Sequence, residues 1–275
     1  QLETTTYPNS KSIEYEYVNG DLYKIIWQPD ETTVWQKNDE NAKGQVLATT
    51  LGNGVQGTYT YNTIGVPTSI KAAKGTASLL NIGYQNIDAR GNIKNRSEQT
   101  TSQSENFTYD SMNRLTTGVE YGENGNILFK ADAGTYQYEA SRPHAIRSLS
   151  PTSNDVLPKL DLSVTYNSVR LPVQLSEGNK VYTLTYNGEN SRVKSQFVQN
   201  GSTVFTKYYC GPYEEILKGG TTRKNYYIYG GGQIVAVYTE GASDAGMYYF
   251  HNDHLGSPWL ITNASGNEVQ GLNFN

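Results

Sequence analysis

Polar and apolar residues alternate with a period of two along most of the chain. Residues 181–186 and 203–208 show this pattern, and turn-forming residues bound each of them. A period of two predicts half-buried strands. No stretch repeats its apolar residues at the 3.6-residue period of a capped helix, so the pattern predicts an all-β protein.

Turn-forming dipeptides separate the expected strands. Asn-Gly, which favours two-residue hairpin turns, begins at positions 19, 53, 124, 187 and 200. The clearest predicted hairpins pair residues 192–199 with 202–209 across Asn200-Gly201, and residues 224–229 with 233–238 across Gly230, Gly231 and Gly232. A long loop is predicted at residues 150–158. Because no linker rich in Pro, Ser or charge interrupts the pattern, we expect one continuous array of antiparallel hairpins.

A short phrase recurs along the array: an aromatic or aliphatic residue, any residue, a tyrosine, and then Asn or Asp. Its clearest copies end in Tyr61-Asn62, Tyr109-Asp110, Tyr166-Asn167 and Tyr186-Asn187. With looser copies included, the lead tyrosines fall at 61, 84, 109, 138, 166 and 186, in steps of 20 to 29 residues. Such a period is typical of repeat proteins built from small pieces of sheet.

The array is expected to be an open, curved sheet, because it contains few repeats. Hairpins in series leave unpaired backbone at the first and last strands. Both ends of the sequence read as cuts through a longer protein, so we expect neighbouring repeats outside this sequence to cover these edges.

Composition narrows the classes of partner. The 275 residues contain 22 Lys plus Arg against 26 Asp plus Glu, a formal net charge of −4, which gives no reason to expect nucleic acid or an anionic membrane as the main partner. The sequence contains no run of eighteen apolar residues, so it predicts no membrane-spanning helix. The single cysteine, Cys210, has no histidine near it in sequence, and we expect it to be a packed, small apolar residue.

One segment has candidate metal or acid–base chemistry. His251, Asp253 and His254 could bind zinc or share a proton. Residues three apart on a strand point to opposite faces, however, so the two histidines converge only if the segment turns. We therefore expect a structural role for these three residues, and neither a metal nor another cofactor.

Acid pairs and tryptophans each allow both a functional and a structural interpretation. The acid pairs Glu14/Glu16 and Glu214-Glu215 could serve a glycosidase, but surface charges on strands are the commoner reason for such pairs. Exposed aromatic residues could stack on sugars, and the candidates are Trp27, Trp35 and Trp259. The many recurring tyrosines favour a different arrangement, in which aromatic side chains pack one turn of the sheet on the next.

The repeats and the last third of the sequence resemble a known family. Tyr109-Asp110 is the pair for which the YD-repeat, or Rhs-repeat, family is named. Residues 248–258, YYFHNDHLGSP, resemble the aromatic-rich DHLGS signature of the Rhs-associated core. The matching positions of this signature and of the glycine turn after it are Tyr249, His251, Asp253, His254, Leu255, Gly256, Ser257, Gly266 and Asn267. By this resemblance, residues 1–205 are a YD/Rhs-repeat array, and residues 206–275 begin the core, continuous with the array.

The resemblance implies a long β-ribbon that spirals into a hollow shell. In bacterial members, and in the related C subunit of toxin complexes, the shell encloses a toxic C-terminal polypeptide; in teneurins a related barrel serves adhesion. The chain is then expected to be a non-catalytic shell segment of a bacterial protein that is secreted or on the cell surface. Its partners would be the remaining repeats and the C-terminal cargo of its own longer chain.

The alternative is a surface adhesin whose repeats bind a carbohydrate or a protein. In toxin members the core ends in a self-cleavage motif that lies beyond the DHLGS block. The sequence stops before that motif and holds no cargo segment, so we expect this chain neither to cleave itself nor to be toxic.

Overall fold

The computed structural model describes residues 2–152 and 161–272, which form strands and turns and no helix. The predicted all-β class is therefore confirmed. Each strand pairs antiparallel with the next one along the chain, within three separate sheets. The N-terminal sheet contains β1(Thr4–Thr6), β2(Ser12–Val18), β3(Asp21–Trp27), β4(Thr32–Glu40), β5(Val46–Leu51), β6(Gln56–Tyr61), β7(Pro67–Lys74), β8(Ala77–Gln85), β9(Asn95–Glu98) and β10(Gln103–Asn106).

The other two sheets follow in chain order. The middle sheet contains β11(Val119–Tyr121), β12(Ile127–Lys130), β13(Gly134–Glu139) and β14(Arg142–Pro151). The C-terminal sheet contains β15(Leu162–Tyr166), β16(Pro172–Glu177), β17(Lys180–Tyr186), β18(Arg192–Gln199), β19(Ser202–Cys210), β20(Tyr213–Lys218), β21(Thr221–Gly230), β22(Gln233–Glu240), β23(Gly246–Asn252), β24(Pro258–Asn263) and β25(Glu268–Gly271).

The ladder is not continuous, which corrects one sequence prediction. Between β10 and β11 only the isolated bridge Tyr109↔Leu115 is present in the described residues. Strand β10 has the sequence QSEN, with no apolar side chain to bury on either face, so little holds a further strand against it. The predicted division after residue 205 falls inside β19, which pairs with both β18 and β20.

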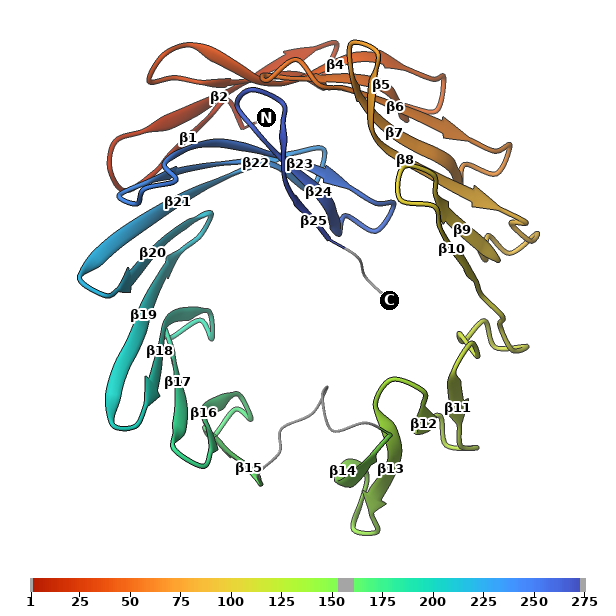
Figure 1. The fold of residues 1–275 in the computed structure, drawn as a ribbon, viewed down its shortest axis with the longest axis vertical. Helices are drawn as coiled ribbons and strands as arrows, with labels where there is room; N and C mark the ends of the chain where they lie inside the picture. Colours follow the sequence, from red (N-terminus) through yellow and green to blue (C-terminus); the bar gives the residue numbers. More distant parts are fainter. Residues whose placement is uncertain (1, 153–160, 273–275) are drawn as a thin grey trace.

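The three sheets follow one another around a ring (Figure 1). Strands β21 to β25 return past the start of the chain and lie on the inner side of β1 to β8 (Figure 1). Strands β1 and β25 are in different sheets, so hydrogen bonds do not close the ring. The expected open, curved arrangement is thus confirmed. The chain is nevertheless long enough for its ends to overlap and pack together, which its few repeats did not suggest.

Most predicted turns form, and their backbone explains why. Asn19-Gly20 and Asn200-Gly201 have positive φ at both residues, 52° and 92° in the first and 52° and 74° in the second, as two-residue hairpin turns require. The second predicted hairpin turns only at Gly231-Gly232, because Gly230 still pairs with Gln233. The predicted loop 150–158 is partly strand, since β14 continues to Pro151, and its residues from 153 on lie outside the described residues.

Alternation gives each sheet an inner and an outer face. Residues opposite one another in an antiparallel pair point to the same side, and the register places Ile13, Ile25, Trp35, Ile70 and Ile82 on the inner face of the N-terminal sheet. This apolar face is covered by the outer face of β21 to β24. The core therefore lies between the two ends of the chain, in two clusters of buried side chains.

Candidate functional site

The Asn or Asp of each repeat closes the turn that follows it. Asn62 Oδ1 accepts hydrogen bonds from the backbone N–H of Ile64 (3.1 Å) and Val66 (2.9 Å). Gly65, with a φ of 90°, provides the left-handed residue that lets the chain reverse. The same pair of bonds is made by Asn41, Asp88, Asp110, Asn167, Asn187, Asp253 and Asn263. A carboxylate oxygen and a carboxamide oxygen can both accept these bonds, so both Asp and Asn occur at this position.

The tyrosine before the cap joins consecutive repeats. The Tyr61 hydroxyl donates to the carbonyl oxygen of Val46 (3.1 Å), which lies five residues after the preceding cap, Asn41. Two further tyrosines repeat the bond at the same spacing: Tyr109 to Ile93 (2.9 Å) and Tyr186 to Pro172 (2.9 Å). Tyr166, the first repeat tyrosine of the C-terminal sheet, is exposed. The Tyr-Asp pair is thus a two-part device that fixes its own turn and ties it to the previous one.

The dipeptide rule gave the wrong turn at positions 53, 124 and 187, where five-residue turns form instead. Position 187 is the clearest case. Gly188 is not left-handed, and the positive φ belongs to Asn190 (64°). The five-residue turn capped by Asn187 outcompetes the two-residue Asn-Gly turn, because it satisfies two backbone N–H groups at once.

We predict that Asn187→Ala destabilises this turn locally, while Asn187→Asp keeps it. Alanine leaves the N–H groups of Glu189 and Ser191 without their acceptor, at a cost of about 1 kcal/mol. Hydrogen exchange followed by NMR at these two amides should be about fivefold faster in the alanine variant, by conversion of that energy. Unchanged exchange at both amides would show that the side chain does not hold the turn.

The DHLGS segment is a capped turn of the same kind in a buried setting. Asp253 accepts from the backbone N–H of Leu255 (2.9 Å) and of Ser257 (2.9 Å), and Gly256 takes a φ of 84°. Asp253 is buried, while Leu255 points to solvent. The following turn, from Asn263 through Gly266 to Asn267, contacts the N-terminal sheet, because Lys74 Nζ donates to the carbonyl oxygen of Ser265 (2.5 Å). Both turns therefore lie at the overlap of the two chain ends, which we call the seam.

His251 is part of a buried hydrogen-bonded chain across the seam. The Asn53 amide, in the β5–β6 turn, donates to Thr262 Oγ1 (2.9 Å). His251 Nε2 lies 2.9 Å from the same Oγ1. Because Thr262 already accepts from Asn53, we assign its hydroxyl proton to a bond with His251 Nε2, which must then be unprotonated. Burial lowers the pKa of His251 to about 4, in agreement with a neutral ring.

His254 makes a second contact across the seam, with Tyr84 of β8. Its backbone N–H donates to the Tyr84 hydroxyl (3.2 Å), and its Nδ1 lies 3.0 Å from the same oxygen. Burial lowers the pKa of His254, while the Asp253 carboxylate opposes this shift. The segment does turn after His251, so both histidines face the N-terminal sheet. They meet different partners there, and no group of three or more possible metal ligands occurs among residues 2–152 and 161–272.

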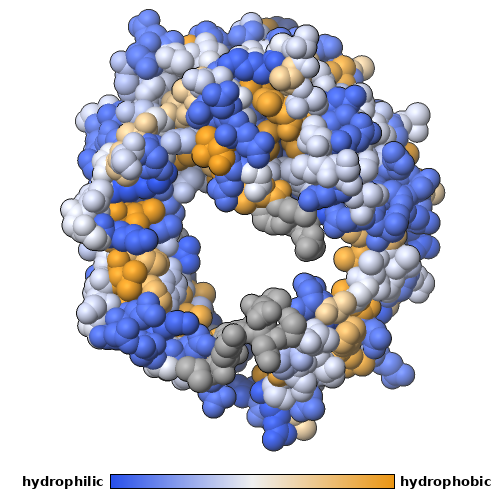
Figure 2. Space-filling model, viewed as in Figure 1, coloured by the Kyte–Doolittle hydropathy of each residue, from blue (hydrophilic) through white to orange (hydrophobic). Residues whose placement is uncertain are grey.

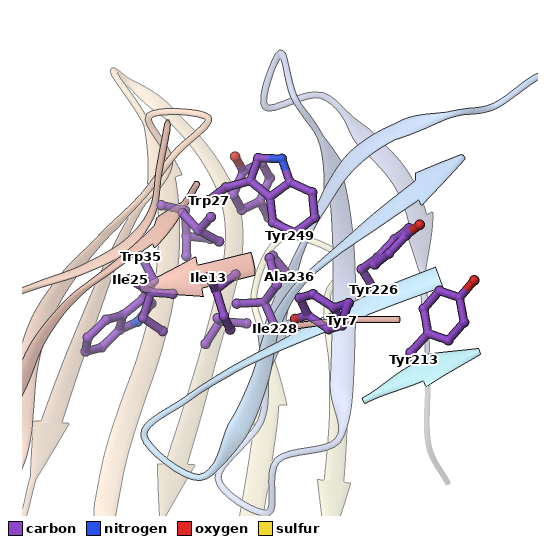
Figure 3. Close-up of a cluster of buried hydrophobic side chains, with 13 residues drawn as sticks. Tyr7, Ile13, Ile25, Trp27, Trp35, Tyr213, Tyr226, Ile228, Ala236 and Tyr249 are labelled. Carbon is purple, nitrogen blue, oxygen red and sulfur yellow. The ribbon is translucent and has the colours of Figure 1, made fainter. Parts of the chain in front are cut away.

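Aromatic side chains fill the rest of the seam. Tyr226 packs against Tyr7 (ring centroids 5.3 Å apart), Tyr213 (5.0 Å) and Trp27 (6.0 Å), as Figure 3 shows. At the other end, the Arg96 guanidinium lies 4.7 Å from the centre of the Trp259 ring, in favourable cation–π geometry. Trp27, Trp35 and Trp259 are 3%, 7% and 5% exposed. The tryptophans therefore pack one turn of the ribbon on the next and offer no open face for a sugar.

The remaining candidates from the sequence are the two acid pairs and Cys210. Glu214 faces inward, 3.5 Å from Lys207 Nζ, whereas Glu215 faces outward and accepts from the Tyr213 hydroxyl (2.5 Å). Neighbours on one strand cannot meet across a cleft, as a pair of glycosidase carboxylates must. Glu14 and Glu16 point to the same face, with Gln28 and Lys24 as their partners. Cys210 is exposed at the end of β19, so the prediction of a packed cysteine is wrong.

Sequence reasoning missed the N-terminal partners of the seam: Asn53, Tyr84 and Arg96. One signal could have indicated that such partners exist, though not which residues they are. Strands β21 to β24 contain runs of apolar residues, such as Ile234 to Tyr238, where β15 to β19 alternate. Strands that are apolar on both faces are buried on both faces, so something had to cover their outer side.

Comparisons with known proteins give matches by structure and none by sequence. No protein-family model and no curated protein sequence matches the chain. Solved structures do: a TcdB2-TccC3-TEV chain (TM-score 0.74, 15% identity, covering 100% of this chain and 17% of that one) and a TcdB2-TccC3-Cdc42 chain (0.77, 14%, 97% and 17%). A third match is the Photorhabdus luminescens Tc holotoxin pore with the mutation TccC3-D651A (0.73, 15%, 100% and 17%).

These matches extend over nearly the whole chain, which spans 17% of the length of each solved chain. No helix in the described residues is long and apolar enough to cross a membrane. The chain therefore has an all-β fold that recurs as a segment of chains in toxin complexes.

Proposed function

We propose that the chain is a wall segment of a hollow β-shell of the Rhs type, which encloses a C-terminal polypeptide of its own longer protein. One observation carries the proposal: the ribbon curves through a full turn around an open middle, and β15 to β19 turn an apolar face toward it. Figure 2 shows the opening in the space-filling view. A wall of this shape contains a guest by geometry and needs no catalytic group.

The C-terminal sheet shows the two faces clearly. Val164, Leu175, Tyr182, Phe197 and Phe205 share the inner face of β15 to β19, and each is half-buried. The residues between them on the outer face are polar and exposed: Thr165, Gln174, Thr183 and Thr185. A single-layer sheet with this asymmetry favours water outside and apolar contacts inside.

Two independent likenesses support the Rhs assignment. The DHLGS segment lies at the seam, where it ties the inner layer of the ribbon to the outer one, as a shell-closing motif should. Solved chains of the same fold belong to a Tc holotoxin, and one of their complexes is described as lacking a hypervariable C-terminal region. By this proposal the chain is non-catalytic, uses no cofactor, belongs to a bacterial protein that is secreted or on the cell surface, and has its own C-terminal cargo as its partner.

The test is intact-mass analysis of the natural full-length polypeptide, followed by limited proteolysis. A shell predicts that the region after the repeats is protected while the wall is intact and becomes sensitive once the wall is unfolded by urea. Release of a co-purifying fragment after the core would further support self-cleavage. Equal protease sensitivity with and without urea would contradict containment and favour the adhesin alternative, which a glycan array would then examine.

A further inference from the structure

Both histidines of the DHLGS segment contact groups that join the two layers of the seam; His251 is buried and His254 is half-buried. His251 reaches Thr262 and, through it, Asn53, while His254 reaches Tyr84. The chain's third histidine, His144, lies on β14, away from the seam. We propose that the seam is an acid-sensitive closure: when His251 and His254 take up protons, strands β21 to β25 separate from the N-terminal sheet. The proposal concerns the chain alone and does not depend on what the ribbon encloses.

The surroundings of His251 suit a neutral ring and oppose an imidazolium. Strand β24 presents Leu260 and Thr262 to it, and the β5–β6 turn presents Asn53; none of these carries a charge. The cavity beside His251 has a volume of about 230 Å³. Its titratable groups are Tyr59, Tyr61 and Lys71 from the N-terminal sheet and Asp253 and His254 from the segment of His251 itself. Tyr249 faces the same side from its own strand.

None of these groups compensates a charge on His251. Lys71 is itself a cation, and its side chain lies on the outer face of β7, so it offers no compensating charge. The Asp253 carboxylate accepts two backbone N–H bonds of its own turn, so it is already engaged. A protonated Nε2 could no longer accept from Thr262, and that hydroxyl would lose its acceptor inside the seam.

His254 stands between opposing charges. Asp253 on its own turn favours the protonated ring, whereas Arg96 of β9 opposes it and burial adds to the opposition. The other titratable contact is Tyr84, the pKa of which is raised by burial. Since Tyr84 stays protonated at neutral and acidic pH, its hydroxyl can donate to Nδ1 only while that nitrogen is unprotonated.

The sign of the pH effect follows from proton binding in the two states. The pKa of His251 is about 4 in the closed seam against 6.5 for an exposed histidine, so the open state binds more protons between these values. Closure is then fully favoured above pH 6.5 and weakens as the pH falls toward 4. For His251 alone, the opening equilibrium constant should be about 30-fold larger at pH 5 than at pH 7.5.

Thiol labelling can measure this constant directly. With Cys210→Ser removing the only native thiol, Ala72→Cys places a reporter on β7 in the seam, at a site that is 3% exposed. Ser195→Cys is the matched control, because Ser195 is 0% exposed but lies on the inner face of β18, outside the seam. Labelling by dithiodipyridine, divided by its rate on the urea-unfolded chain at the same pH, gives the opening constant.

The expected result is a rise of about 30-fold for the Ala72→Cys reporter between pH 7.5 and 5, with the Ser195→Cys rate and the far-UV circular dichroism unchanged. His251→Gln, or His254→Gln if the first variant folds poorly, should flatten the response, while His144→Gln should keep it. A rise equal at both reporters would mean general unfolding and would overturn the proposal. So would a flat response, or a full response in the protein with both His251→Gln and His254→Gln.

Discussion

Replacing Tyr226 by alanine should lower the free energy of unfolding by about 4 kcal/mol, one of the two largest effects we expect from one side chain. Tyr226 is 0% exposed and touches four other aromatic rings at the seam. Its hydroxyl donates to Glu240 (2.6 Å) and accepts from the Asn9 amide (2.7 Å). Removal leaves a ring-sized void between the layers and takes one hydrogen bond each from Glu240 and Asn9. Urea unfolding followed by tryptophan fluorescence measures the loss.

Tyr229 provides the control for this prediction. It lies on the same strand, β21, three residues further along, but 43% of it is exposed. Tyr229→Ala should therefore cost about 1 kcal/mol or less. Tyr226→Phe separates the two contributions, because it keeps the ring and removes only the hydroxyl. Equal losses for Tyr226→Ala and Tyr229→Ala would show that the seam does not stabilise the chain.

Replacing Trp259 by alanine should have a comparable effect at the other end of the seam, about 3–5 kcal/mol. Trp259 belongs to the second buried cluster and covers the guanidinium of Arg96. Arg96 Nε donates to Glu105 (2.7 Å), so this ion pair survives the change. The Arg96 guanidinium, however, loses the Trp259 ring that covers its face. Thermal unfolding by circular dichroism measures the effect as a lower melting temperature.

A double-mutant cycle with Arg96→Met isolates the cation–π part of that loss. We expect a coupling energy of about 1 kcal/mol between Trp259 and Arg96, within the range known for partly desolvated pairs. Trp259→Phe is the conservative variant and should retain about half of the stability that alanine loses, because a smaller ring still fills part of the space. A coupling energy of zero would mean that Trp259 acts only through apolar packing.

Local features of the fold could be read from the sequence because they depend on neighbouring residues. Alternation predicted strands, and the hairpin from β18 through Asn200-Gly201 to β19 formed nearly as predicted. The recurring Tyr-Asp pair indicated a repeat. The failure at Asn187-Gly188 is instructive, since the same residue has two possible roles in a turn. The cap prevailed because Asn187 Oδ1 reaches two backbone N–H groups, which the dipeptide rule does not consider.

The candidate site was only half visible in the sequence. The DHLGS residues could be singled out and given a structural role, which the backbone bonds accepted by Asp253 now specify. Their partners could not be identified, because the contacts join residues far apart: Tyr84 to His254 over 170 positions, Asn53 to Thr262 over 209, and Tyr7 to Tyr227 over 220. The exposure of Cys210, likewise, depends on where β19 lies in the ring.

The sequence by itself determined the unit, a capped hairpin tied to its neighbour by a tyrosine, and the separation of apolar from polar faces. Only the tertiary structure decided which strands meet across the seam. The physical reason is that curvature is a sum: each strand turns slightly relative to the last, as twisted sheets do, and no single repeat encodes the total. After some twenty strands that sum brings β21 to β24 onto the inner face of β2 to β9, and there His251 becomes buried and His254 meets Tyr84.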